Sequence, residues 1–122
     1  MSRERLINII NDTLNRCDNE YKWMIDESEN VFYDKNDIKI RNEDFSNQVD
    51  ISLVQQTTVE AIENNSDKVY VVLNFASAKH PGGGVLKGCV AQEEALARVS
   101  TLYPVIKECK EFYTERPKDL YY

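Results

Sequence analysis

Basic charge is in short supply in this sequence of 122 residues. Lys and Arg number 15 against 21 Asp and Glu, which gives a formal net charge of −6. General polyanion binders present a basic surface, so this balance argues against direct DNA binding. Long apolar runs are also missing, since none approaches the roughly 20 residues of a membrane helix. The N-terminal segment MSRERLINII lacks the pattern of a signal peptide. These absences predict a cytoplasmic protein with no membrane partner.

Cysteine is scarce as well. The three cysteines are an odd number without CxxC spacing, which favours neither a disulfide framework nor a zinc site. The composition, 42% hydrophobic and 30% charged, is that of a globular protein. A chain of this length buries enough surface for a core but has no room for a second one. We therefore expect residues 1–122 to form a single domain.

Hydrophobic spacing predicts α/β secondary structure. An amphipathic helix is expected over Ser2–Cys17, with Leu6, Ile7, Ile10 and Leu14 on one face and Ser2 as its N-cap. Further helices are expected over residues 19–27, 58–64, 91–102 and 105–113. The helix at 58–64 would begin with a capping box of Thr57 and Glu60. Short strands are expected within residues 31–40 and 49–54.

The clearest predicted strand is VYVVL, residues 69–73. Its continuous apolar, β-branched run is typical of a strand covered on both faces of a sheet. In open α/β sheets, ligands bind outside the carboxyl ends of the strands. For this strand, that end leads into a glycine-rich loop.

All four glycines of the chain lie within seven residues, at positions 82, 83, 84 and 88. Successive glycines let the backbone approach a ligand and let N–H groups converge on an anion. The N-terminus of a following helix favours the same charge. Lys79, His80 and Lys87 surround the loop, and no acid occurs in residues 75–91. This loop is therefore a candidate phosphate or diphosphate site.

Two common phosphate motifs do not fit this loop. A P-loop requires Gly-Lys-Ser/Thr at the start of its helix, whereas Lys87 is followed by Gly88 and Cys89. The dinucleotide motif GxGxxG requires its third glycine one position before Gly88. The loop therefore belongs to neither class.

Seven residues separate Gly84 from the sequence Gln92-Glu93-Glu94, which begins the next predicted helix. Neighbouring helical residues point about 100° apart, so this pair cannot flank a bond as the two opposed carboxylates of the usual glycosidases do. The two glutamates can instead perform different tasks on one ligand, one holding a hydroxyl and one transferring a proton.

The run NFASAKHPGGGVLKGCVAQEEALARVSTLYP, residues 74–104, closely resembles the microbial-type poly(ADP-ribose) glycohydrolases, whose signature is a glycine triplet followed after a short gap by Gln-Glu-Glu. The resemblance extends more weakly to the N-terminal helix and to the closing Leu-Tyr-Tyr. It implies a macrodomain-like three-layer α/β/α sheet. Family members are longer and complete the sheet in a second half, so this chain is expected to be an incomplete, N-terminal half.

The resemblance also implies a reaction, which is hydrolysis of the ribose–ribose O-glycosidic bond with release of ADP-ribose. Glu94 would be the catalytic acid that protonates the leaving 2′-oxygen and then activates water. Glu93 would hold ribose hydroxyls. Gly82, Gly83 and Gly84 would line the diphosphate and the scissile ribose.

Three further residues carry implied binding roles. Asn74 and Ser77 would approach the ligand at the strand end, and Gln92 would orient the loop. The family implies no metal and no other cofactor. Its implied partner is ADP-ribose or poly(ADP-ribose) on modified proteins.

Other interpretations stay open. The loop could bind ADP-ribose without cleaving it, or the chain could act only after dimerising through the surface left open by the missing half, or after pairing with a C-terminal half. Glu93 and Glu94 could simply interact with the helix dipole. His80 is interpreted as a loop residue and Cys89 as a packing residue, both outside catalysis.

Overall fold

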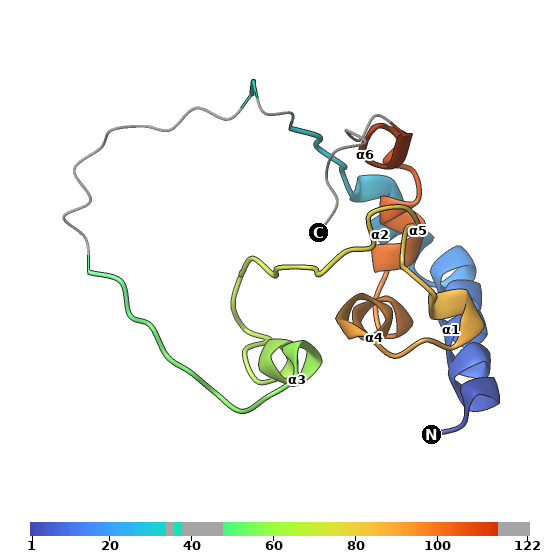
Figure 1. Ribbon diagram of the computed structural model, residues 1–122, viewed down its shortest axis with the longest axis horizontal. Helices are drawn as coiled ribbons and strands as arrows, with labels where there is room; N and C mark the ends of the chain where they lie inside the picture. Colours follow the sequence, from blue (N-terminus) through green and yellow to red (C-terminus); the bar gives the residue numbers. More distant parts are fainter. Residues whose placement is uncertain (34–35, 38–47, 115–122) are drawn as a thin grey trace.

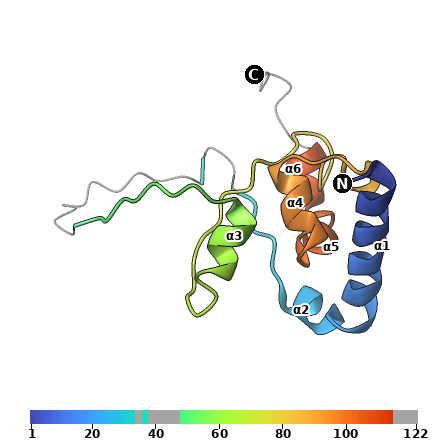
Figure 2. The ribbon, with the colours of Figure 1, turned by 90° about the horizontal axis from the view of Figure 1, so that it is seen from below.

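The computed structural model describes residues 1–33, 36–37 and 48–114. Within these residues the order is α1 (Arg3–Asn19), α2 (Lys22–Glu27), α3 (Thr58–Glu63), the 3-10 turn η1 (Val85–Lys87), α4 (Gln92–Arg98), α5 (Leu102–Ile106) and α6 (Lys110–Thr114). In both views, α4 lies between α1 and α3 (Figures 1 and 2). Among the described residues, no helix combines the length and apolar character needed to cross a membrane.

The first helix forms as its sequence predicts. The Ser2 hydroxyl accepts a hydrogen bond from the backbone N–H of Arg5 at 3.2 Å, so it caps the N-terminus of α1. Leu6, Ile10 and Cys17 are buried along one face, in the three- and four-residue spacing of an amphipathic helix. The predicted helix is confirmed, and it extends two residues further than expected.

The core lies where α1, η1 and α4 meet. Ile10, Val85 and Ala97 are fully buried against one another, and the partly buried Leu14 and Tyr103 pack on them. Val85 directly follows the glycine triplet in the chain. Burial of its side chain therefore fixes the end of the glycine loop to the core.

The predicted capping box at the start of α3 is confirmed. The Thr57 hydroxyl accepts from the Glu60 N–H at 3.2 Å, and the Glu60 carboxylate accepts from the Thr57 N–H at 2.7 Å. These reciprocal bonds satisfy two donors that a helix start otherwise leaves unpaired. The start of α3 is therefore determined locally, by residues of its own first turn.

The predicted three-layer α/β/α sheet is wrong for the described part of the chain, which contains helices and irregular segments but no strand. Residues 69–73 do not pair with another segment there. Val69 and Val71 are fully exposed, at 103% and 100%. A strand is defined by hydrogen bonds to a neighbouring strand, so β-propensity alone cannot produce one. The pieces predicted at 31–33 and 49–54 are likewise not strands, and residues 38–40 lie outside the described residues.

The helices after the glycine loop are shorter than predicted. The helix expected over 91–102 ends at Arg98, and a separate helix, α5, begins at Leu102. Pro104 lies in the first turn of α5. There its missing N–H has no intrahelical acceptor to lose. Pro104 therefore fits α5 instead of ending α4.

Candidate functional site

The glycine triplet forms a tight turn between residues 80 and 85. The Gly83 N–H donates to the His80 carbonyl at 2.9 Å, and the Val85 N–H donates to the Gly82 carbonyl at 3.1 Å. Gly82 and Gly83 have φ angles of 71° and 57°, in the left-handed region that side chains disfavour. The turn therefore requires glycine at both positions.

Gly83 also lets a carboxylate approach the backbone closely. A Cβ atom at this position would lie 2.5 Å from Glu94 Oε1 and 3.1 Å from Glu94 Cδ. Any side chain at Gly83 would thus displace the Glu94 carboxylate from its present place. The lack of a side chain at Gly83 is what brings Glu94 against the turn.

The Glu94 carboxylate lies at an open groove of about 640 Å³. Glu94 is only 7% exposed, and its Oε1 accepts a hydrogen bond from the Gly84 N–H at 2.9 Å. The groove is lined by Ser77, His80, Pro81, Gly83, Gly84, Leu86, Lys87, Cys89, Glu94 and Tyr103. Its charged groups are thus one carboxylate and the basic side chain of Lys87, with the imidazole of His80 nearby.

The Glu93 carboxylate points into the protein instead of the groove. It is 2% exposed, and its Oε2 accepts from the Ser77 N–H at 2.7 Å. Its Oε1 accepts from the Gly82 N–H at 3.1 Å and from the Asn74 side-chain amide at 3.5 Å. One buried carboxylate therefore joins three parts of the loop between residues 74 and 82. Its predicted contact with ribose hydroxyls stays a prediction.

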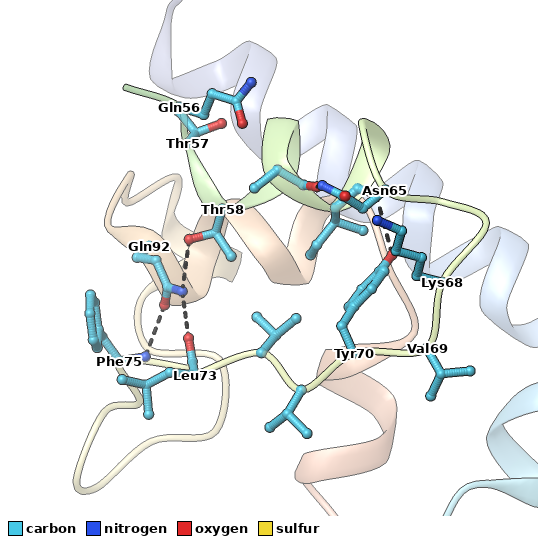
Figure 3. Close-up of a pocket in the computed structure, with 14 residues that line it drawn as sticks. Gln56, Thr57, Thr58, Asn65, Lys68, Val69, Tyr70, Leu73, Phe75 and Gln92 are labelled. Carbon is cyan, nitrogen blue, oxygen red and sulfur yellow. Dashed lines mark hydrogen bonds between the residues drawn. The ribbon is translucent and has the colours of Figure 1, made fainter. Parts of the chain in front are cut away.

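Gln92 connects the start of α4 to the segment that precedes the loop (Figure 3). Its amide oxygen accepts from the Phe75 N–H at 2.9 Å, and its amide nitrogen donates to the Leu73 carbonyl at 2.9 Å. The same nitrogen donates to the Thr58 hydroxyl of α3 at 3.3 Å. At the end of residues 69–73, Gln92 thus bonds the backbone carbonyl of Leu73 and the backbone N–H of Phe75, two groups that a neighbouring strand would bond in a sheet.

Asn74 and Ser77 both donate a hydrogen bond to Glu93, Asn74 from its side-chain amide and Ser77 from its backbone N–H. Asn74 donates to Glu93, and its side-chain oxygen is buried without a hydrogen-bond partner in the described part of the chain. The Ser77 hydroxyl accepts from the backbone N–H groups of Lys79 and His80, at 3.3 and 3.2 Å. Ser77 also lines the groove, whereas Asn74 does not.

Sequence analysis missed the part that Tyr103 plays in the groove. The Tyr103 ring lines the groove and packs on the core, and a Cβ at Gly82 would lie 2.6 Å from its Cδ2 atom. Lys107 Nζ lies over the same ring, 5.9 Å from its centroid. Tyr103 lies within residues 74–104, the run that resembles the family. This position was the one indication in the sequence that Tyr103 could contribute to the groove.

The family model for the microbial-type PARG catalytic domain matches residues 8–122. The chain belongs to this family. The predicted family is therefore confirmed, and the match includes the glycine turn, the Gln-Glu-Glu sequence and the groove between them. Neither a curated protein nor a solved structure shows significant similarity to this PARG-family chain.

In this PARG-family chain, burial and the nearby Glu93 carboxylate raise the pKa of Tyr113. Burial, followed by the negative charges of Glu93 and Cys109, raises the pKa of Tyr113 in α6 from its usual 10 to about 12. The proton of Tyr113 is therefore held more tightly in the folded chain than in the unfolded one.

This raised pKa predicts a loss of stability in alkaline solution. The unfolded chain ionises Tyr113 near pH 10 and the folded chain near pH 12, so stability is unaffected below pH 10 and falls as the pH rises towards 12. We expect urea unfolding to show that fall in the wild type and a smaller one in Tyr113→Phe. A tyrosinate absorbance titration in which Tyr113→Phe removes a group ionising near pH 10 would contradict the prediction.

Proposed function

We propose that this PARG-family chain hydrolyses the ribose–ribose O-glycosidic bond of poly(ADP-ribose), with Glu94 as the catalytic acid. The observation that carries the proposal is the opposite placement of the two glutamates. Glu94 lines the groove, whereas Glu93 is hydrogen-bonded within the loop and does not line it. Only one of the two carboxylates is thus available to a ligand in that groove.

The hydrogen bonds of Glu94 suit proton transfer. Its Oε1 accepts from the Gly84 N–H, and no other hydrogen bond to Glu94 occurs within the described residues, so we assign proton transfer to Oε2. Protonated Glu94 donates to the 2′-oxygen of the leaving ribose as the bond to the anomeric carbon breaks. Water then adds to the oxocarbenium-like anomeric carbon and returns its proton to the Glu94 carboxylate.

The groove offers a basic side chain for the diphosphate of the substrate. The backbone N–H groups of Gly82, Gly83 and Gly84 donate to Glu93, to the His80 carbonyl and to Glu94, respectively. These three donors are therefore occupied by protein acceptors in this conformation. Lys87 lines the same groove with an exposed basic side chain, and we assign diphosphate binding to it.

The direct test is release of ADP-ribose from poly(ADP-ribosyl)ated protein by the full chain. The product is separated by chromatography, and heat-unfolded chain provides the blank. Release above the blank supports the proposal. ADP-ribose binding by calorimetry without release would instead favour a non-catalytic binding module, and absence of both binding and release would contradict the proposal.

A further inference from the structure

Outside the groove that Glu94 lines, a positive charge is buried without a partner among the described residues. The Arg98 side chain, at the C-terminal end of α4, is only 7% exposed. Its guanidinium nitrogens Nε and Nη2 are buried and have no hydrogen-bond partner among the described residues. A guanidinium keeps its charge at physiological pH, so this charge is not removed by loss of a proton.

The two unpaired nitrogens form a fork that suits a carboxylate. Nε and Nη2 lie on one edge of the planar guanidinium and present parallel N–H donors, the arrangement that binds both oxygens of a carboxylate. A buried charge without a partner is strongly destabilising. The ion pairs of the described residues, Arg16 with Asp12 and Lys22 with Asp26, do not include Arg98. An anion bound from solution would therefore pair the Arg98 guanidinium and stabilise the fold.

Arg98 lines a cleft of about 600 Å³ formed by the N-terminal part of α1, the start of α3 and one side of α4. A volume of this order is typical of sites for small organic molecules, about 300–1,000 Å³. The cleft walls are mainly apolar and include Leu6, Ile9, Val59, Val90, Leu96 and Val99. No acidic residue of the described part of the chain lines the cleft.

The other polar groups that line this cleft are largely engaged within the protein. The Thr57 hydroxyl caps α3, and the Thr58 hydroxyl accepts from Gln92. The Gln92 amide is bonded to the backbone of residues 73 and 75. Met1 and Gln56 also line the cleft and are exposed, so the guanidinium of Arg98 is the buried cationic group that can orient a ligand.

We propose that this cleft binds a small organic carboxylate. The apolar body of the ligand packs against the cleft walls, and its carboxylate accepts hydrogen bonds from Nε and Nη2 of Arg98. Because protein atoms cover both nitrogens, the Arg98 side chain turns toward the cleft as the ligand enters, a kind of rotamer change common in binding. The site is distinct from the proposed catalytic groove, because Arg98 does not line that groove and Glu94 does not line this cleft.

The test is calorimetric titration of the full chain with hexanoate, and with hexan-1-ol and hexylamine as matched ligands that lack the carboxylate. We expect hexanoate to bind, and to bind at least about tenfold more weakly to Arg98→Met, which removes the charge-assisted hydrogen bonds. Arg98→Lys keeps the charge but loses the fork, so its affinity should lie between the two. Arg98→Met removes an unpaired buried charge and should melt at the wild-type temperature or above it.

Three results would overturn the proposal: no hexanoate binding, equal binding of hexanol, or unchanged hexanoate affinity in Arg98→Met. If Arg98→Met does not fold, Ala95→Leu serves instead, because Ala95 lines the cleft and a larger side chain fills it. Hexanoate binding by Ala95→Leu at wild-type affinity would then contradict the site. Binding of a capped Leu-Glu-Leu peptide without hexanoate binding would also overturn it and assign the cleft to a protein partner. None of these measurements depends on release of ADP-ribose.

Discussion

Glu94→Gln is expected to lower ADP-ribose release by about 10²–10⁴-fold, the usual contribution of a general acid–base group. Glutamine keeps the carbonyl oxygen that accepts from the Gly84 N–H, but it cannot donate and recover a proton at the leaving oxygen. The measurement is the initial rate of ADP-ribose release from poly(ADP-ribosyl)ated protein, at equal concentrations of wild type and variant.

Two controls separate a loss of proton transfer in Glu94→Gln from a loss of folding or of ligand binding. The free energy of unfolding of Glu94→Gln should stay within about 1 kcal/mol of the wild type, because its one hydrogen bond from the loop is preserved. ADP-ribose binding should persist as well. Release by Glu94→Gln at more than about a tenth of the wild-type rate would contradict the assignment of Glu94 as catalytic acid.

Glu93→Gln should have its largest effect on stability. The Glu93 carboxylate is 2% exposed and accepts three hydrogen bonds, from Ser77, Gly82 and Asn74. A glutamine has one acceptor oxygen, so its NH₂ group must face a donor N–H and leave it unpaired. We expect a loss of about 3 kcal/mol in the free energy of unfolding, since hydrogen bonds to charged groups and unsatisfied buried donors each contribute on this order.

Urea unfolding followed by circular dichroism measures this loss. Glu94→Gln is the matched control, because it makes the same chemical change at the neighbouring residue, where the carboxylate accepts one hydrogen bond that glutamine can keep. A Glu93→Gln stability equal to that of Glu94→Gln would mean that the hydrogen bonds of Glu93 do not hold the loop. Roughly 3 kcal/mol is a large share of the 5–15 kcal/mol that stabilises a typical domain.

The position of the candidate site was predictable from the sequence, but the division of labour within it was not. The glycine triplet and the Gln-Glu-Glu sequence, which seven residues separate from it, identify the loop and the helix start. Which glutamate faces a ligand depends on the direction in which α4 meets the loop. Burial of Ala97 against Ile10 and Val85 sets that direction, and these residues lie on three separate elements.

In the fold too, features that depend on neighbouring residues were predictable, and features that depend on distant residues were not. The Ser2 cap of α1 and the capping box of α3 involve residues at most three positions apart, so sequence alone predicted them. The strand predicted at residues 69–73 depends on partners far along the chain. Its apolar run was correctly recognised, but the described residues contain no segment that pairs with it.

The sequence by itself therefore determined the capped helices, the turn that only glycine can form at residues 82 and 83, and the membership of the microbial-type PARG family. The tertiary structure alone decided that Glu94 lines the groove while Glu93 is bonded to the loop, and that two guanidinium nitrogens of Arg98 are buried without a partner among the described residues. The physical reason is the separation along the chain between the residues that interact. Caps and turns are stabilised by neighbours in the chain, whereas the burial and pairing of a charge depend on which distant segments pack around it.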